Sequence, residues 1–254
     1  MALPILEVFL DVVLVAVVFT AASLASAWAL LRGMSSRWVV LIGALGALVF
    51  VGVYFFFVQS SGSGFFAEGQ KDFEAVWALQ SPALLKSGVP QETIDLVKLF
   101  ALKYFLWAFP AWMAVGCLAA GLLSYYLASA LLRRVTDRVG EPLAFRYWVL
   151  PEFLIFGFIT ACLLKLFTPL NSTADVVGDN LLVFFIGIYT LGGLSIVSFY
   201  FNKWRLSIFW RVVNYFLMFQ FCLQTLAVVA GLGMLDVWLD LRKLKPILSG
   251  EKKP

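Results

Sequence analysis

The chain contains no histidine among its 254 residues. This absence excludes histidine-ligated haem, histidine-bound copper or zinc, and any nucleophilic site built on a serine–histidine or cysteine–histidine pair. The sequence also lacks a phosphate-binding loop, a GxSxG elbow, a CxxC pair and an HExxH motif. We therefore expect a protein that is not an enzyme, with no catalytic residues, no metal site and no cofactor.

Charged residues are scarce as well. Asp, Glu, Lys and Arg make up 13% of the chain and 62% of it is hydrophobic, whereas soluble domains carry about 25% charged residues. A water-soluble fold of this size could not hide so much apolar surface, but helices that cross a bilayer do not need to hide it. The composition therefore predicts an all-α, polytopic membrane protein.

The net charge of +4 does not indicate a nucleic-acid-binding protein. Lys and Arg occur in short groups beside the apolar runs, where membrane topology and anionic lipid headgroups explain them. The partner that this charge pattern predicts is the lipid bilayer, and we expect no contact with nucleic acid.

The apolar runs set the expected architecture. Because about 20 apolar residues suffice to cross the hydrocarbon core, we expect a single transmembrane helical domain over residues 1–254, with a charged tail at residues 236–254. Its six spans are expected at residues 3–31, 38–59, 97–132, 150–167, 181–200 and 206–234. Arginines in the odd-numbered loops favour external termini, whereas the basic tail favours internal ones, so the orientation stays open.

The long polar segment after the second span predicts one or two surface helices within residues 64–95. Its apolar residues fall on one side of a helix, as in helices that lie on a bilayer. Ser81 and Pro82 are expected to begin a short helix that closes at Gly88, and Pro90 to begin the next. The segment is either a structural hairpin or a loop that covers a ligand site.

Small residues and one proline mark further features of the spans. Ala21 and Ala25 lie four residues apart in the first span, and Gly116 and Ala120 do so in the third. Such spacing allows close packing of helices in lipid, with a neighbour in this chain or in a partner. Pro110 should interrupt the long helix expected over residues 90–134.

Polar residues within the spans are candidate ligand-binding residues. Asn214, Gln220 and Gln224 fall in the last span, where Gln220 and Gln224 would share one helix face. They serve either interhelical hydrogen bonding or a site for a small amphipathic molecule. Glu152 follows Pro151 at the start of the fourth span, where it either begins the helix or has a functional role.

The end of the last span carries spaced charges. Asp236 and Asp240 lie four residues apart, and Arg242 and Lys243 follow directly. On a helix the two carboxylates would share a face at the membrane edge, where we expect a structural ion-pair latch, for instance with the arginines of another loop. Two carboxylates without further ligands do not make a metal site.

From about Phe145 onward the sequence resembles the YybS-like family of bacterial membrane proteins. The resemblance rests on Pro151, on the glycine-containing fifth span, and on the ending with Gly231, Gly233, Asp236, Asp240, Arg242 and Lys243. This family is distantly similar to the substrate-binding (S) subunits of energy-coupling-factor transporters, six-helix proteins that capture a small molecule and associate with an ATPase module. The resemblance implies a multi-pass protein of the bacterial cytoplasmic (inner) membrane.

Two functions are therefore expected. The first is a small-molecule-binding transport subunit, with a pocket near Asn214, Gln220 and Gln224 that the segment 60–95 covers, and with other membrane subunits or an ATPase module as partners. The second is a non-catalytic membrane scaffold or assembly subunit, which docks partner proteins through the small-residue helix faces.

Overall fold

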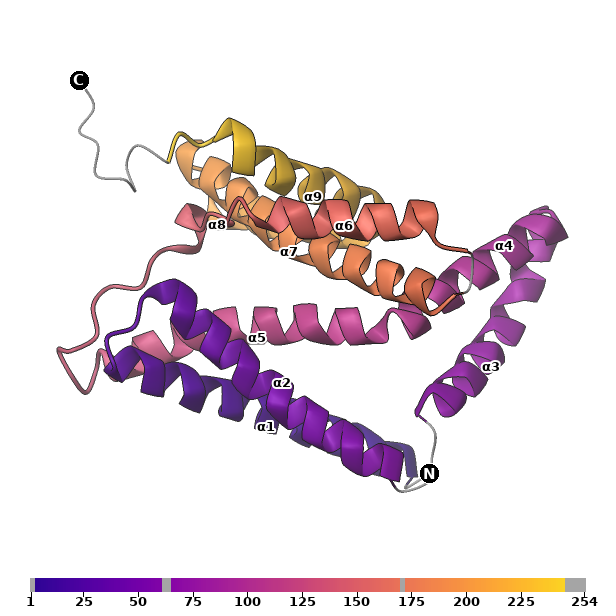
Figure 1. Cartoon of the computed structure of the whole chain (residues 1–254), viewed down its shortest axis with the longest axis horizontal. Helices are drawn as coiled ribbons and strands as arrows, with labels where there is room; N and C mark the ends of the chain where they lie inside the picture. The colour runs from indigo at the N-terminus through magenta and orange to yellow at the C-terminus, as the bar shows by residue number, and fades with distance from the viewer. Residues whose placement is uncertain (1–2, 61–64, 170–171, 245–254) are drawn as a thin grey trace. The chain divides into compact units, whose positions relative to one another are not determined.

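The computed structural model describes residues 3–60, 65–169 and 172–244. Within these ranges every regular element is a helix, which confirms the all-α class that the composition predicts. The contacts divide the chain into two compact units, Met1–Pro142 and Leu143–Pro254, where the sequence predicts one domain. These are named the N-terminal unit and the C-terminal unit, and both are drawn in Figure 1.

In the described part of the chain, four helices are long and apolar enough to cross a membrane. They are Val13–Leu31 within α1 (Leu3–Leu31), Ser36–Phe57 within α2 (Ser36–Ser60), α5 (Phe109–Leu132) and α7 (Thr173–Lys203). The count becomes five if α8 (Ile208–Gln220) and α9 (Cys222–Leu239), which are bent by 111°, form one broken span. The expected six spans are therefore not confirmed.

Helix α6 (Leu154–Phe167) accounts for the difference between five spans and the expected six. It covers most of the expected span 150–167 but has only 14 residues, which is about 21 Å at 1.5 Å per residue. The hydrocarbon core is about 30 Å thick, so α6 is too short to cross it upright. Pro151 precedes this helix, and Glu152 lies in the turn that leads into it.

Helices α1, α2 and α5 form the bundle of the N-terminal unit (Figure 1). The hydroxyls of Ser36, at the start of α2, and Tyr125, in the second half of α5, lie 2.9 Å apart. The hydroxyl of Ser23 in α1 donates to that of Ser124 in α5 over 3.3 Å. Together with the core of Ala22, Ala47, Cys117 and Ala120, these contacts show that α1 and α5 run parallel and α2 antiparallel to both.

Small residues bring these three helices close together. A Cβ at Gly46 of α2 would lie 3.0 Å from the Cβ of Ala25 and 3.2 Å from the carbonyl oxygen of Ala21. Ala120 is buried in the core of the bundle. Ala21, Ala25 and Ala120 therefore pack against neighbours in the same chain, whereas Gly116 is exposed and a Cβ there would meet nothing within 4 Å.

Between α2 and α5 the chain forms a helical hairpin of α3 (Phe65–Lys86) and α4 (Gln91–Ala101) (Figure 1). One or two surface helices are expected here, with a helix starting at Ser81 and Pro82, but α3 runs through Pro82 without a break. Proline has no backbone N–H, so Pro82 removes one hydrogen bond within the helix, but α3 continues through it to Lys86. The hairpin turns at Gly88, which has a φ of +86°, and α4 begins after Pro90 as the sequence predicts.

A π-helix, η1 (Leu102–Trp107), joins α4 to α5. The α-helical conformation is interrupted at Ala108, and Pro110 falls in the first turn of α5. A proline is favoured at that place because its missing N–H would have no partner within the helix. The long helix expected over residues 90–134 is thus interrupted beside Pro110, as the sequence predicts.

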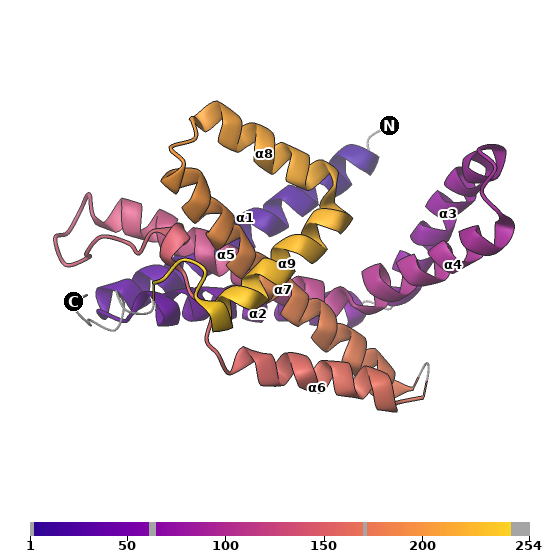
Figure 2. The ribbon, with the colours of Figure 1, turned by 90° about the horizontal axis from the view of Figure 1, so that it is seen from above.

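In the C-terminal unit α7 is the central helix. Helices α6 and α9 and the 3-10 turn η2 (Phe145–Tyr147) all pack on it. Helices α7 and α9 cross at glycines, since a Cβ at Gly193 would overlap the carbonyl oxygen of Val229 and one at Gly233 would overlap that of Tyr189. Figure 2 shows α8 leading away from the end of α7 and α9 returning across α7.

The last expected span, residues 206–234, is divided between α8 and α9. Phe221 leaves the helical conformation, with φ −101° and ψ 41°, and the chain changes direction there. Gln220 ends α8 and Gln224 lies in the first turn of α9. The prediction that these two glutamines share one helix face is therefore wrong.

We expect Gly233→Ala to destabilise the protein, because its methyl group would meet the backbone of α7, which cannot turn aside as a side chain can. Overpacking costs about 1–3 kcal/mol, and a protein of this size loses about 2–4 °C in Tm for each kcal/mol. Thermal unfolding in mild detergent measures this loss.

Gly231→Ala is the matched control, since a Cβ there would meet nothing within 4 Å and alanine favours helix over glycine. Its Tm should stay unchanged or rise slightly. Equal Tm values for the two variants would contradict the glycine crossing of α7 and α9.

Candidate functional site

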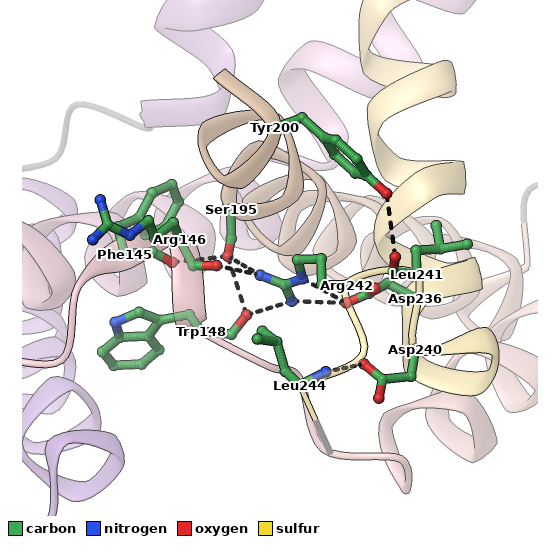
Figure 3. A network of polar contacts seen from close by, with 10 residues as sticks. All are labelled: Phe145, Arg146, Trp148, Ser195, Tyr200, Asp236, Asp240, Leu241, Arg242 and Leu244. Atoms are coloured by element: carbon green, nitrogen blue, oxygen red, sulfur yellow. Dashed lines mark hydrogen bonds and ion pairs between the residues drawn. The ribbon is translucent and has the colours of Figure 1, made fainter. Parts of the chain in front are cut away.

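Two clusters of buried charged side chains lie on α7, one towards each end of the helix. The Arg242 cluster consists of Arg242, Asp236 and Ser195 with the backbone carbonyls of Phe145, Arg146 and Trp148 (Figure 3). The Lys165 cluster consists of Lys165, Asp175 and Asp179. Asp175 and Ser195 are about 30 Å apart along the helix axis at 1.5 Å per residue, which matches the thickness of the hydrocarbon core.

All five N–H donors of the Arg242 guanidinium group are used. Nε and Nη2 donate to Oδ2 of Asp236 over 3.1 and 2.7 Å. Nη1 donates to the carbonyl oxygen of Arg146 and to the hydroxyl of Ser195, both at 2.7 Å, and Nη2 also reaches the carbonyl oxygen of Trp148 at 2.8 Å. Because the side chains of Arg242 and Asp236 are only 1% and 5% exposed, this cluster binds α9, α7 and the η2 segment together.

Asp240 and Tyr200 hold the turn of the backbone that contains Arg242. Asp240 ends α9 in the left-handed conformation with φ 43°, and its carboxylate accepts a hydrogen bond from the N–H of Leu244 over 2.8 Å. The Tyr200 hydroxyl donates to the carbonyl oxygen of Leu241 over 3.2 Å (Figure 3). This turn carries Arg242 back over Asp236, while Lys243 remains exposed.

These contacts differ in detail from the expected latch. Asp236 lies in α9, but Asp240 terminates that helix, so the two carboxylates do not act as a pair on one helix face. Asp236 pairs with Arg242 of its own segment, and Arg146 contributes its carbonyl oxygen rather than its charge. Of the two glycines in this ending, Gly233 lies at the crossing with α7 and Gly231 does not.

The Lys165 cluster joins α6 to the start of α7. The ammonium group of Lys165 lies 2.9 Å from Oδ1 of Asp179 and also contacts Oδ1 of Asp175. The two carboxylate side chains are only 3% and 1% exposed, whereas that of Lys165 is 20% exposed. The lysine is therefore the member of the cluster that surrounding molecules reach first.

The sequence contains a signal for this cluster that the expected span 181–200 omits. Helix α7 begins at Thr173, so the polar stretch before residue 181 forms its first two turns. Ser172 is the N-cap and its hydroxyl accepts a hydrogen bond from the N–H of Asp175 over 3.2 Å. Ser-x-x-Asp is a helix-start signature, and it places Asp175 and Asp179 on one helix face. Lys165, near the end of α6, contacts both of these carboxylates.

The expected ligand-binding residues are not gathered at one place in the parts that the structure describes. The Asn214 side chain donates to the carbonyl oxygen of Trp210 in its own helix over 2.8 Å. Gln220 and Glu152 are exposed, and the side chain of Gln224 lies outside the described part of the structure. Among the described residues, no group of three or more His, Cys, Asp or Glu side chains could hold a metal ion.

A groove of about 370 Å³ lies in the N-terminal unit between α1 and α5. Its lining is almost entirely apolar, and it includes none of the four expected ligand-binding residues. This groove thus differs from the expected polar pocket in both place and chemistry.

Comparison with known proteins assigns the family. A family model described as "Predicted membrane protein (DUF2232)" matches residues 1–237. The chain therefore belongs to this family and is an integral membrane protein. No curated protein and no solved structure matches it. The resemblance to the YybS-like family and to energy-coupling-factor subunits remains a hypothesis.

We expect Arg242→Lys to destabilise the protein, because lysine supplies three donors in place of five and lacks the planar guanidinium fork. Leaving buried acceptors and part of a buried ion pair unmatched should cost on the order of 3 kcal/mol. The midpoint of thermal unfolding in mild detergent measures the loss.

Lys243→Asn serves as the control, since Lys243 is exposed with a φ of 53° and asparagine tolerates that conformation. If Arg242→Lys unfolded at the same temperature as Lys243→Asn, the Arg242 cluster would not hold the C-terminal unit together.

Proposed function

We propose that this protein is a small-molecule-binding subunit of a transport system in the bacterial cytoplasmic membrane, with the Lys165 cluster as its ligand site. The observation that supports this most is the burial of Asp175 and Asp179 on one face of the membrane-spanning helix α7. Ionisable residues in membrane segments are rare and most often mark substrate or ion pathways, because burying them is costly.

The arrangement favours a ligand with a positively charged group. Two carboxylates four residues apart on a helix point to the same side and both contact the ammonium group of Lys165. An amine of a small molecule presents the same chemistry as the end of that lysine. Such a group would bind by taking the place of Lys165 between the two carboxylates.

Lys165 is suited to being displaced. It is the most exposed member of the cluster, and its four-carbon stem is flexible. The stem lies over Gly178 of α7, where a Cβ would come within 3.2 Å of Cδ of Lys165. Glycine at this position therefore leaves room for the stem, whereas the two aspartates are fixed to one rigid helix.

The proposal also requires partners. The sequence carries no phosphate-binding loop, so energy for transport would come from elsewhere. We infer that other membrane subunits or an ATPase module associate with this chain, as the distant similarity to energy-coupling-factor S subunits implies.

A second candidate function is a non-catalytic scaffold that docks partner proteins. It is supported by the α3–α4 hairpin, on which Leu79, Leu96 and Phe100 are 80%, 62% and 60% exposed. Most of the expected small-residue faces are occupied within the N-terminal unit, so docking would use this hairpin and the open position at Gly116.

The test is purification of the full chain from native membranes in a gentle detergent, followed by mass spectrometry of everything that stays bound. The wild-type protein should retain a small cationic molecule in stoichiometric amount. Asp179→Asn should retain it at least about tenfold less well, because a hydrogen bond to a charged group contributes about 1.5–3 kcal/mol.

Asp137→Asn is the control, since Asp137 is an exposed carboxylate of the N-terminal unit and its loss should leave ligand recovery unchanged. Equal recovery from Asp179→Asn and wild type would exclude the Lys165 cluster as the ligand site. Recovery of envelope or assembly proteins without any small molecule would favour the scaffold instead.

A further inference from the structure

The groove between α1 and α5 has the character of a hydrocarbon-binding site. Leu24 and Ala27 of α1 line one side, and Leu127 and Leu131 of α5 line the other. With a volume of about 370 Å³, it falls in the range of small-molecule sites, about 300–1,000 Å³. The small side chain of Ala27 helps to leave this space open.

The two hydroxyl groups of the groove are already engaged within the protein. The hydroxyl of Thr20 donates to the carbonyl oxygen of Ala16 over 2.8 Å, and that of Ser23 donates to Ser124 over 3.3 Å. A polar ligand body would therefore find little to bond in the groove and would lose its hydration. A hydrocarbon chain has no hydrogen bonds to water that it would lose on entering the groove.

One end of the groove is strongly basic. Leu131 and Leu132 line the groove, and Arg133 and Arg134 follow them directly in the chain. Because α1 runs parallel to α5, Arg32 lies at the same end, with its guanidinium carbon 4.9 Å from the centre of the Trp28 ring. All three arginines are exposed.

These arginines are available to an external anion. Arg133 has an exposed partner, Glu141, at 3.5 Å, and exposed pairs of this kind contribute about 0–1 kcal/mol. Within the described residues the Arg134 side chain makes no ion pair, and the guanidinium group of Arg32 lies over the Trp28 ring. Guanidinium groups bind phosphate with two parallel hydrogen bonds.

An apolar groove at membrane depth that opens onto exposed arginines matches one kind of molecule. We propose that the groove binds an acyl chain of an anionic phospholipid, whose phosphate is held by Arg133 and Arg134 of α5 and Arg32 of α1. The positive charge at one end of the groove favours a lipid over a second copy of the chain. An apolar helix of a second copy could fill the groove, but it would offer no negative charge to the arginines.

The same arginines set the orientation of the N-terminal unit. Arg32 and Arg37 flank the turn between α1 and α2, and Arg133, Arg134 and Arg138 follow α5. An excess of Arg in short loops marks the cytoplasmic side, where anionic lipids attract basic residues by about 1 kcal/mol each. The lipid site therefore faces the cytoplasmic leaflet.

Native mass spectrometry of the full chain, freed of lipid in a non-ionic detergent, tests the proposal. Phosphatidylglycerol and phosphatidylcholine with identical acyl chains are titrated separately. We expect wild type to bind phosphatidylglycerol at least about tenfold more tightly. The double variant Arg133→Gln/Arg134→Gln should bind both lipids equally. Arg138→Gln, which lies further along the chain from Leu132 of the groove, should keep the preference.

A second pair of variants tests the acyl chain. Leu127→Trp should fill the groove and weaken the binding of both lipids about tenfold or more. Leu45→Trp, at a similarly exposed leucine of α2, should weaken the binding of neither lipid. Helix content by circular dichroism shows that each variant is folded, and Arg134→Gln alone replaces the double variant if that fails to fold.

Two results would overturn the proposal. One is equal affinity of the wild type for the two lipids. The other is a dimer that Leu127→Trp dissociates, since a second copy would then occupy the groove.

Discussion

A charged side chain within apolar surroundings is stable only where opposite charge and hydrogen-bond partners meet it, and the C-terminal unit is built on this constraint. Arg242 satisfies it with five donors directed at one carboxylate, one hydroxyl and two carbonyl oxygens. Lys165 satisfies it with two carboxylates. Helix α7 carries both clusters, and the elements that supply the partners, α6, η2 and α9, are the ones that pack on it.

Stable packing of the helices also requires that their backbones approach closely, because lipid provides no hydrophobic force that drives helices together. The N-terminal unit meets it at Gly46 and at Gly121, where a Cβ would lie 2.6 Å from the backbone nitrogen of Ala44. The C-terminal unit meets it at Gly193 and Gly233. The two units thus share one packing principle. Two of the polar contacts between the bundle helices of the N-terminal unit are hydroxyl pairs, whereas both clusters on α7 contain ion pairs.

The sequence predicts most helices but few of the contacts between them. Apolar length is enough to find α1, α2 and α5, and Pro110 is enough to place an interruption. The break at Phe221 has no proline or glycine beside it, so no local signal separates Gln220 from Gln224. The start of α7 was detectable from Ser172 and Asp175, whereas the pairing of Asp236 with Arg242 depends on the left-handed turn at Asp240, which spacing alone does not reveal.

The spacing of the two charge clusters along α7 has a consequence for the membrane itself. The helix has 31 residues, about 46 Å at 1.5 Å per residue, and its uncharged middle is bounded on both sides by buried ionic groups. Sliding α7 along the bilayer normal would draw one of them towards the bilayer centre, and tilting α7 would draw both. A lipid layer of matching thickness therefore fits the C-terminal unit best, and hydrophobic mismatch in thicker or thinner membranes would sort the protein among them.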